Sequence, residues 1–594
     1  MVRKLVLLLL MISCIVLPLS SHESEYYPVS SEEWRLVDDI CRLSGVTGPS
    51  SFGPVTGRQL LLALERAEKK GASPSLLEKA REMIYAYDGL YEDDLGSIAL
   101  EVELNLEGYY QTNGDELTVP SFGYDNEWFV RNYRERPSTL ALKLESTVGD
   151  HFYSRFVMPA REKQIMKEFY WNDSFHFLGQ SMVMEQNYPY DAGVSFSSNN
   201  LSLITGRGKV SQGEGFTGNT AVGDNYDYQE FLKLGANTRN TGFFLTLTNF
   251  DSSRQAIADS GHLVTEPWKV QNAKFSGYRE LRHSAGYEAS IFDKVKVSLS
   301  FVTLLDTDTA FDFRYLNPFM VMHSYFNYHE DTVLEANNII SLDLSFAIAR
   351  GLRLYFQFSM DQIQFSSEAK GYANDYLYVD PNAYAALLNI SWSKDIEDGI
   401  LTLFGEAVYT SPAMYLNQKY YDSYDREGNV TQYKGQIENG QYTSPFEPCW
   451  SQDFLLGYNR TESYGYNADM AFSGYIYGPD AIVFALGGEY YIPEKLKISS
   501  SLFYMMHGEK GRGSDINNYN FSGLDTLETI NVMSPTGVVE HTLVAKVEGD
   551  YIINDYVSIY GGAAFCSFWN YHNVEGKDFT NLQTALGVKL KYSL

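Results

Sequence analysis

Long hydrophobic runs are missing from this chain beyond its first residues, because no later stretch approaches the ~18 consecutive apolar residues of a membrane helix. A chain of this kind crosses a membrane only as a closed β-barrel, since lipid leaves open strand edges without partners. Cysteine is also scarce: Cys14, Cys41, Cys449 and Cys566 are too scattered for a disulfide framework or a CxxC metal site. Positively charged residues are relatively few, because the chain has 46 Lys and Arg against 75 Asp and Glu. We therefore expect no nucleic-acid partner.

Catalytic and cofactor motifs are lacking as well. The sequence has no HExxH pair and no GxSxG elbow, and the glycine-rich run at residues 508–513 lacks the Lys-Ser/Thr end of a phosphate loop. Asp306, Asp308 and Asp312 are oxygen-rich, but the glycine and glutamate of a calcium loop are absent. We expect a protein that is not an enzyme and that holds no metal or cofactor.

The first residues have the layout of a secretory leader. Arg3 and Lys4 precede an apolar core, and Pro18 is followed by the small residues Ser20 and Ser21. This predicts a signal peptide over residues 1–21; lipidation at Cys14 is the alternative.

Strict alternation of apolar and polar residues is the main structural signal. Residues 340–348 and 352–360 alternate on either side of Arg350-Gly351, and each arm is close to the ~9–11 residues of a membrane-crossing strand. The pattern recurs at residues 100–107 and 482–502. Aromatic residues make up 15% of the chain, which suits interfacial girdles. Residues 97–594 are therefore predicted to form an all-β, large antiparallel transmembrane barrel of about 18 strands, in the outer membrane.

A small helical module is predicted between the leader and the first strand, within residues 22–96. Ser30 and Glu33 form a capping box for a first helix that stops at Gly45, and Thr56 with Gln59 opens a second. A third begins at Ser73-Pro74 and ends near Gly89. Such a module is too small to bury much core alone, so we expect it to pack against another part of the protein, of which the barrel mouth is the nearest.

The last residues resemble the C-terminal insertion signal of bacterial outer-membrane barrels. Gly587 precedes the spaced apolar residues Leu590 and Tyr592, although Leu594 stands where the terminal residue is usually Phe. The expected partners are accordingly outer-membrane lipid and the barrel assembly machinery.

A family resemblance appears in residues 201–221. Gly206-Arg207, Gln212-Gly213-Glu214-Gly215 and Gly218-Asn219-Thr220-Ala221 resemble the Gly-Arg strand, the Trp-Gly-Pro-Gly turn and the Ser-Asn-Asn-Ala stretch of Wzi-type capsule-assembly outer-membrane proteins. Gln212 and Glu214 replace the Trp and Pro of that turn. The resemblance implies a barrel plugged by helices that binds surface polysaccharide. A porin for small solutes and a structural or adhesive surface barrel are the alternatives.

One candidate glycan-binding element is the long loop after Thr410. Aromatic faces stack on sugar rings, and Asn and Gln bond hydroxyls, although an ordinary aromatic surface loop has the same composition. The candidate side chains are Tyr415, Tyr420, Tyr421, Tyr424, Tyr433 and Tyr442.

Candidate lumen-lining charges form a second group. Arg207 and Glu214 are expected to satisfy one another inside the barrel, or to help hold a ligand or plug. Glu101 and Glu103 lie on the polar face of a predicted strand, where they would either set cation preference or simply be solvated.

Overall fold

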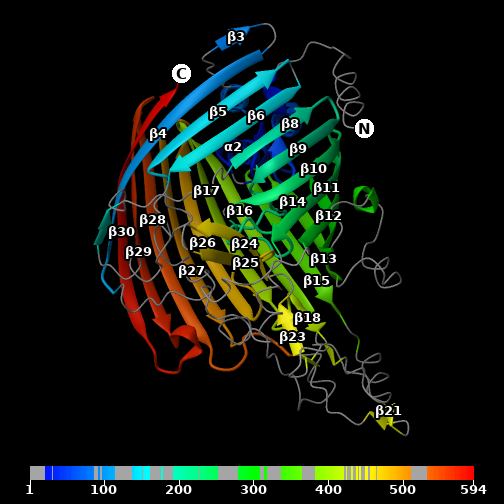
Figure 1. The fold of residues 1–594 in the computed structure, drawn as a ribbon. Coiled ribbons are helices and arrows are strands. Elements are labelled where there is room, and N and C mark those ends of the chain that lie inside the picture. The colour runs from blue at the N-terminus through cyan, green and yellow to red at the C-terminus, as the bar shows by residue number, and fades with distance from the viewer. Residues whose placement is uncertain are drawn as a thin grey trace.

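The computed structural model shows a closed β-barrel with helices inside it (Figure 1). The described residues are 21–29, 31–85, 91–93, 96–113, 137–149, 151–160, 175–177, 191–226, 228–251, 279–307, 313–317, 336–363, 365, 382–419, 423–424, 430–431, 437–438, 441–442, 449–452, 455–462, 465–509 and 532–593.

Eighteen antiparallel strands form the ring, which confirms the predicted all-β barrel of about 18 strands. In spatial order they are β4 (Gly96–Gln111), β5 (Leu140–Val148), β6 (Phe152–Ala160), β8 (Asp191–Ser197), β9 (Leu201–Gly208), β10 (Gln229–Asn237), β11 (Thr241–Asp251), β12 (Arg279–Ile291), β13 (Val295–Thr307), β14 (Ala336–Ala349), β15 (Leu352–Gln362), β16 (Ala383–Ile396), β17 (Gly399–Thr410), β26 (Ala481–Ile492), β27 (Leu496–His507), β28 (Glu540–Asn554), β29 (Val557–Trp569) and β30 (Phe579–Ser593). Strand β30 then pairs with β4 and closes the ring.

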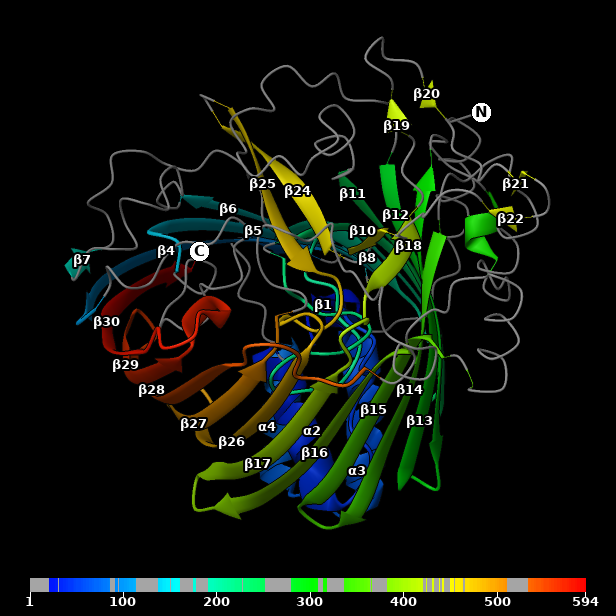
Figure 2. The same ribbon diagram turned by 90° about the horizontal axis from the view of Figure 1, so that it is seen from below.

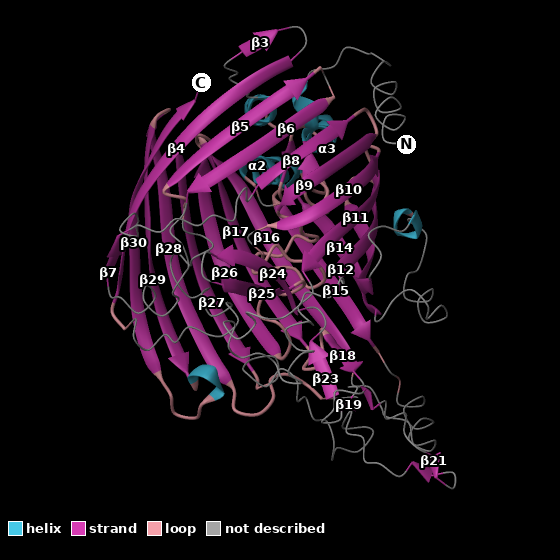
Figure 3. Ribbon diagram, in the orientation of Figure 1, coloured by secondary structure: helices cyan, strands magenta, loops and turns pink. Residues whose placement is uncertain are grey.

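Further short strands lie at the margins of the ring or in its connections (Figure 3). They are β1 (Tyr26–Tyr27), β2 (Val55–Thr56), β3 (Tyr91–Asp93), β7 (Phe175–Phe177), β18 (Leu416–Lys419), β19 (Ser423–Tyr424), β20 (Val430–Thr431), β21 (Ile437–Glu438), β22 (Gln441–Tyr442), β23 (Cys449–Gln452), β24 (Leu455–Glu462) and β25 (Gly465–Phe472). Short 3-10 helices are η1 (Ser21–Ser24), η5 (Phe313–Leu316) and η6 (Tyr571–Asn573).

The two faces of the strands differ as the alternation predicts. In the β14–β15 hairpin, Leu342 pairs with Phe358 on the outer face, whereas Ser341 and Asp343 are buried inside. Gly351 makes the turn with a φ of 80°, a left-handed conformation that glycine adopts without strain. Other large apolar side chains that are exposed on the outer face are Leu144, Leu299, Leu388, Leu403, Leu486, Leu502, Val547, Leu586 and Val588. The exterior is thus an apolar belt.

Connection lengths distinguish the two ends of the barrel. At one end the turns are short, as at residues 350–351, 397–398 and 493–495, and we call this the short-turn end. At the other, long-loop end, residues 411–480 join β17 to β26. Exposed aromatic side chains lie near the short-turn end, namely Trp392, Tyr551, Tyr556 and Tyr592, and towards the long-loop end, namely Tyr110 and Trp569. These aromatic residues lie where girdles are expected.

Three helices lie within the ring at its short-turn end (Figure 2): α2 (Glu32–Ser44), α3 (Gly57–Lys69) and α4 (Pro74–Tyr85). The predicted capping box at Ser30 is wrong by one residue, because the N-cap is Ser31, whose Oγ accepts from the Trp34 amide at 3.2 Å. The predicted start of α3 is confirmed, since the Thr56 amide donates to Gln59 Oε1 at 2.8 Å. None of the described helices is long and apolar enough to span a membrane.

The core of this helical module extends into the barrel wall. Leu36, Val37 and Leu64 are buried between the helices, and Ile400 of β17 and Tyr491 of β26 belong to the same cluster. The module, which is too small to bury a full core itself, completes that core against the ring.

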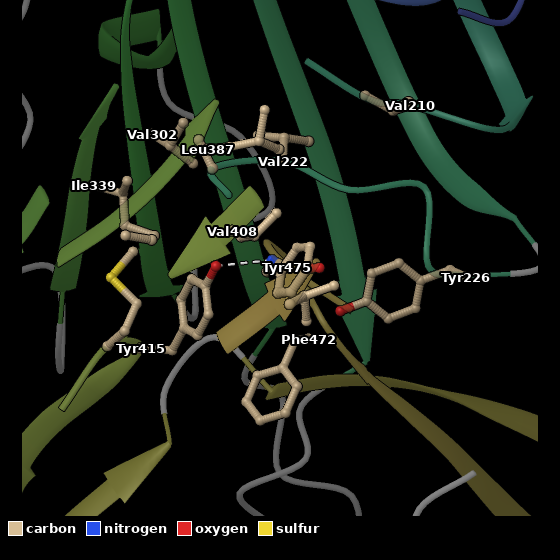
Figure 4. Packing of buried hydrophobic residues seen from close by; sticks show 14 of the residues in the cluster. Val210, Val222, Tyr226, Val302, Ile339, Leu387, Val408, Tyr415, Phe472 and Tyr475 are labelled. Carbon is tan, nitrogen blue, oxygen red and sulfur yellow. Dashed lines mark hydrogen bonds between the residues drawn. The ribbon is translucent and has the colours of Figure 1, made fainter. Parts of the chain in front are cut away.

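A long inward loop, described over residues 209–226 and 228 between β9 and β10, lies in the lumen on the long-loop side of the helices. Gln212 bridges to Phe52 of the helical module and to Val222 of the loop itself. Around the loop, Tyr226, Tyr415 and Tyr475 pack in a large inner cluster (Figure 4), where Tyr415 Oη accepts from the Tyr475 amide at 2.7 Å. The inner cluster therefore joins the loop to the wall.

We predict that a positive charge on the outer face destabilises this fold far more than one on the neighbouring inner face. Leu502→Arg puts a cation among the apolar side chains near the middle of β27 and should cost about 2–4 kcal/mol, whereas Ser501→Arg, facing the lumen, should cost much less. Denaturant titration of the protein folded into lipid vesicles measures both. Equal losses for the two variants would contradict the assigned faces.

Candidate functional site

A buried charge network fastens the helical module to the wall. Asp38 of α2 accepts hydrogen bonds from Arg42, one turn along, and from Arg353 of β15. Arg353 also lies 3.6 Å from Glu214 of the inward loop, and Lys296 of β13 lies 2.5 Å from that same carboxylate. All five side chains are less than a tenth exposed. The network therefore connects helix, loop and wall through charges that water does not screen.

The adjacent acidic residues of α2 differ in their environment. Burial alone would raise the pKa of Asp38, but the guanidinium groups of Arg353 and Arg42 hold it below its usual value. Burial raises the pKa of Asp39. Asp39 Oδ1 accepts from Ser393 Oγ of β16 at 3.1 Å and from Thr402 Oγ1 of β17 at 3.0 Å. Together the pair attaches α2 to three consecutive strands.

Lysines on the wall bind backbone carbonyls of the connection between α2 and α3. Lys233 of β10 donates to the carbonyls of Phe52 and Pro54, the latter at 2.6 Å, and Lys296 donates to that of Pro49 at 2.7 Å. At the short-turn end the Gly351 amide donates to the Arg42 carbonyl at 2.7 Å. With Tyr491 and Glu489 of β26, which contact α2, the helices are held by strands β10 to β17 and β26, on one side of the barrel.

Glu406 of β17 holds the tip of the inward loop. Its carboxylate accepts from the backbone amides of Phe216 at 2.7 Å and Thr217 at 2.8 Å, and from Asn389 Nδ2 at 3.0 Å. Farther along the loop, Gln357 Oε1 accepts from the Thr220 amide at 2.7 Å. These contacts fix which side chain the loop tip presents to the lumen.

The predicted pairing of Arg207 with Glu214 is wrong. Arg207 lies on the opposite face of β9 from the inward-facing Ile204, and it is paired with Glu230 of β10, so it does not line the lumen. The alternation of side chains along β9 places Arg207 on the outer face. The glycines on either side of Arg207 made that alternation hard to recognise in the sequence. Glu214 lies in the lumen, bound to Lys296 and not to Arg207.

Glu101 and Glu103 of β4 lie on the inner face. Glu101 is 2.8 Å from Lys591 and Glu103 is 3.3 Å from Lys589, both on β30. Because these ion pairs bridge the two strands that close the ring, they support the closure as well as lining the lumen.

The tyrosines of the long loop are placed differently from one another. Tyr415 is fully buried, and its hydroxyl donates to the Thr220 carbonyl at 2.7 Å, so its ring does not offer a face at the surface. Tyr424 and Tyr442 lie in the two-residue strands β19 and β22. Tyr420, Tyr421 and Tyr433 lie outside the described residues.

Sequence reasoning missed Asp38, Arg353, Lys233 and Glu406. Two adjacent carboxylates in the apolar stripe of a predicted helix were the available signal for Asp38, because buried acids need partners. No spacing rule identifies a partner 315 residues away, which is the separation of Asp38 from Arg353. Among the described residues, no group of His, Cys, Asp and Glu side chains is arranged to hold a metal ion.

A closed antiparallel ring with an apolar, aromatic-bounded exterior defines the class: this is a multi-pass β-barrel of the outer membrane. Its short turns face the periplasm and its long loops the cell exterior, as in barrels of this class.

Comparison with solved structures agrees on the fold. The chain is similar to Wzi of Escherichia coli, described as a carbohydrate-binding β-barrel involved in group 1 capsule assembly, with a TM-score of 0.50 and 12% identity over 94% of this chain and 98% of that one. It is less similar to OpdO of Pseudomonas aeruginosa (TM-score 0.37, 9% identity, 84% and 98% covered) and to the outer membrane channel DcaP of Acinetobacter baumannii (TM-score 0.34, 8% identity, 85% and 100% covered). No protein-family model and no curated protein sequence matches it.

We predict that Asp38 is needed to hold the helical module. Asp38→Ala leaves Arg353 and Arg42 buried without their carboxylate and should cost about 3–5 kcal/mol. Thermal unfolding in detergent and tryptic cleavage within the module measure the loss. Arg81→Ala, which breaks the exposed ion pair with Glu68, is the control and should cost about 1 kcal/mol or less.

The same contact gives a pH dependence. Because the folded-state pKa of Asp38 lies below the ordinary 3.8, its contribution is complete above that pH and is lost as the pH falls through the folded-state value. The wild-type protein should therefore release the module at acid pH, and Asp38→Asn should remove that transition. A module whose stability does not change below pH 3.8 would contradict the assignment.

Proposed function

We propose that this outer-membrane barrel holds surface polysaccharide at the cell and does not conduct solutes. The observation that carries the proposal is the occupied lumen. Helices α2 to α4 fill one side at the periplasmic end, the inward loop lies above them, and side chains between loop and wall such as Tyr475, Leu387 and Thr220 are completely buried. A diffusion channel needs a continuous water path, which this filling opposes.

The similarity to Wzi supports polysaccharide as the ligand, because that protein is described as a carbohydrate-binding β-barrel in capsule assembly. A porin for small solutes is the second candidate. The half-exposed charged side chains Lys589 and Lys591 on the inner wall favour it, since water reaches them inside the barrel.

Conductance in planar bilayers separates the two candidates. We predict that the purified protein gives no steady open steps, because the plug and the inward loop block the path. Asp38→Ala, which loosens the plug, should give intermittent openings. Steady conductance of the wild-type protein at the level of a general porin would contradict the proposal and favour the channel.

The long loop between β18 and β23 is proposed to contact the polysaccharide. Strands β18 and β23 pair as a stem, with Leu416 opposite Gln452 and Lys419 opposite Cys449. Replacing residues 420–448 by a Gly-Ser turn should preserve this stem and the barrel while releasing surface polysaccharide into the medium. Several weak stacking contacts of about 0.5–1.5 kcal/mol each hold a repeating polymer through multivalency.

Shortening residues 366–381, between β15 and β16, is the matched control and should release less polysaccharide. Heat-modifiability on gels checks folding of both variants, and immunoblots of cells and medium measure retention. If the β18–β23 variant keeps as much polysaccharide on the cell as the intact protein, this loop does not bind it.

A further inference from the structure

One side of the lumen is wetted from the periplasmic end and then closes. On the inner face of β27, β28 and β30, the side chains in the half nearer the short-turn end are partly exposed. Lys497, Lys546 and Lys589 are 33%, 21% and 39% exposed. Nearer the long-loop end of the same strands, Met505, Val544 and Gln583 are 0%, 8% and 3% exposed. Water therefore reaches the lower half of this wall and is excluded from the upper half.

The opposite wall shows no such change in exposure, because its inner side chains are buried near the short-turn end as well. Lys296 of β13 and Arg353 of β15 are each 2% exposed, because the helical module covers them. The helices and their connections contact β10 to β17 and β26, and residues 24–27 contact β5, β6 and β8. Strands β27 to β30 and β4 keep half-exposed inner side chains at this level. We call the wetted space the vestibule. Its lining includes Lys497, Ser499 and Ser501 of β27, Lys546 and Glu548 of β28, and Lys589 of β30.

Charges in the vestibule are paired with one another. Lys546 lies 3.0 Å from Glu548, and Glu489 of β26 lies 3.4 Å from Lys497 and 3.5 Å from Arg35 of α2. Paired charges offer hydrogen-bond donors and acceptors without a strong field of one sign. Such a surface suits a neutral, hydroxyl-rich ligand better than an ion.

An exposed aromatic pair borders the vestibule. The Phe216 ring, at the tip of the inward loop, stacks on Phe404 of β17 with centroids 3.9 Å apart, and Phe216 remains 44% exposed inside the barrel. Phe404 lies over Gly487 of β26, where a Cβ would come within 2.4 Å of its ring, and Ser501 is the cross-strand partner of that glycine. An apolar face thus lies beside the hydroxyl-bearing wall.

Glu406 fixes the backbone at Phe216, because its carboxylate accepts a hydrogen bond from the Phe216 amide. The ring is therefore held in position before any ligand binds. Leaving nearly half of a phenylalanine in contact with water is unfavourable, and a partner that covers it recovers that free energy. Sugar rings present apolar C–H faces and peripheral hydroxyls, which match an aromatic face flanked by hydrogen-bonding groups.

We infer that the vestibule is a blind binding site, entered from the periplasm, for a short neutral segment of polysaccharide stacked on Phe216 and hydrogen-bonded by Lys546 and Glu548. The inference rests on the proposed function for the source of the ligand. The site takes chains of that polysaccharide present on the periplasmic side, and it is separate from the contact proposed at the external loop.

Cysteine labelling tests both the access and the ligand. Ser501→Cys is made with Cys449→Ser, because Cys41 and Cys566 are buried and should not react. A membrane-impermeant maleimide should label Ser501→Cys only after the outer membrane is permeabilised. Short oligosaccharides released by mild acid from the surface polysaccharide of the producing cells should slow this labelling about tenfold at ten times their dissociation constant.

Two phenylalanine variants provide the matched comparison. Phe216→Ala should leave labelling intact and abolish protection by the oligosaccharides. Phe565→Ala removes a ring that is equally exposed, 45%, but on the outer face, and should leave protection unchanged. Ser499→Cys is the second reporter if Ser501→Cys does not fold, as judged by heat-modifiability.

Each remaining outcome overturns part of the inference. Labelling of intact cells from outside would show that the vestibule is not blind, and absence of labelling at both serines after permeabilisation would show that it does not exist. Labelling without protection would remove the sugar site while leaving polysaccharide retention, measured separately on cells, as the test of the proposed function.

Discussion

Closure of the strand ladder between β30 and β4 is the constraint on which the remaining structure depends. Backbone amides and carbonyls find no partners in lipid, and each unpaired group costs several kcal/mol, so a membrane sheet must meet its own first strand. Here the pairing runs from Gln583 opposite Gln111 to Ser593 opposite Glu101, with ion pairs across the same two strands on the inner face. Closure then fixes alternation, because every strand has one face towards lipid and one towards the lumen.

The lumen must be filled by other parts of the chain or by water, because a ring of 18 strands encloses more space than its own side chains fill. Three helices and an inward loop occupy part of it, and the charges that hold them are excluded from water. Buried pairs such as Asp38 with Arg353 add little net stability over an apolar packing, but they are strongly directional, and removing one partner is costly. They therefore serve to fix the position of the helices against β15 to β17, which an apolar interface of the same size would specify less well.

The sequence predicted the elements much better than the contacts between them. Alternation over residues 340–360 and the Thr56 cap follow from local chemistry, so the barrel was predictable, and the helix starts were predictable to within a residue. The charge partners were not, since Arg207 and Glu214 lie seven residues apart in a glycine-rich stretch yet face opposite sides of the wall. Which side of the lumen the helices occupy depends on contacts between residues hundreds of positions apart, such as Asp39 with Thr402, and no local pattern encodes it.

Attachment of the helices to one side has a consequence for the whole barrel. A plug centred in the ring would leave either a sealed lumen or an annular path, whereas helices held by β10 to β17 and β26 leave β27 to β30 wetted from the periplasmic end. Whether that space is a channel depends on what lies between it and the long-loop end. There, the β29–β30 connection makes specific hydrogen bonds to its neighbours. His572 donates its amide to Glu540 at 2.8 Å, and Asn573 Nδ2 donates to the carbonyls of His507 at 3.0 Å and Val538 at 2.7 Å. Directed hydrogen bonds thus join the β29–β30 connection to its neighbours over buried residues, which supports our proposal that the wetted half on the periplasmic side is a site rather than a passage.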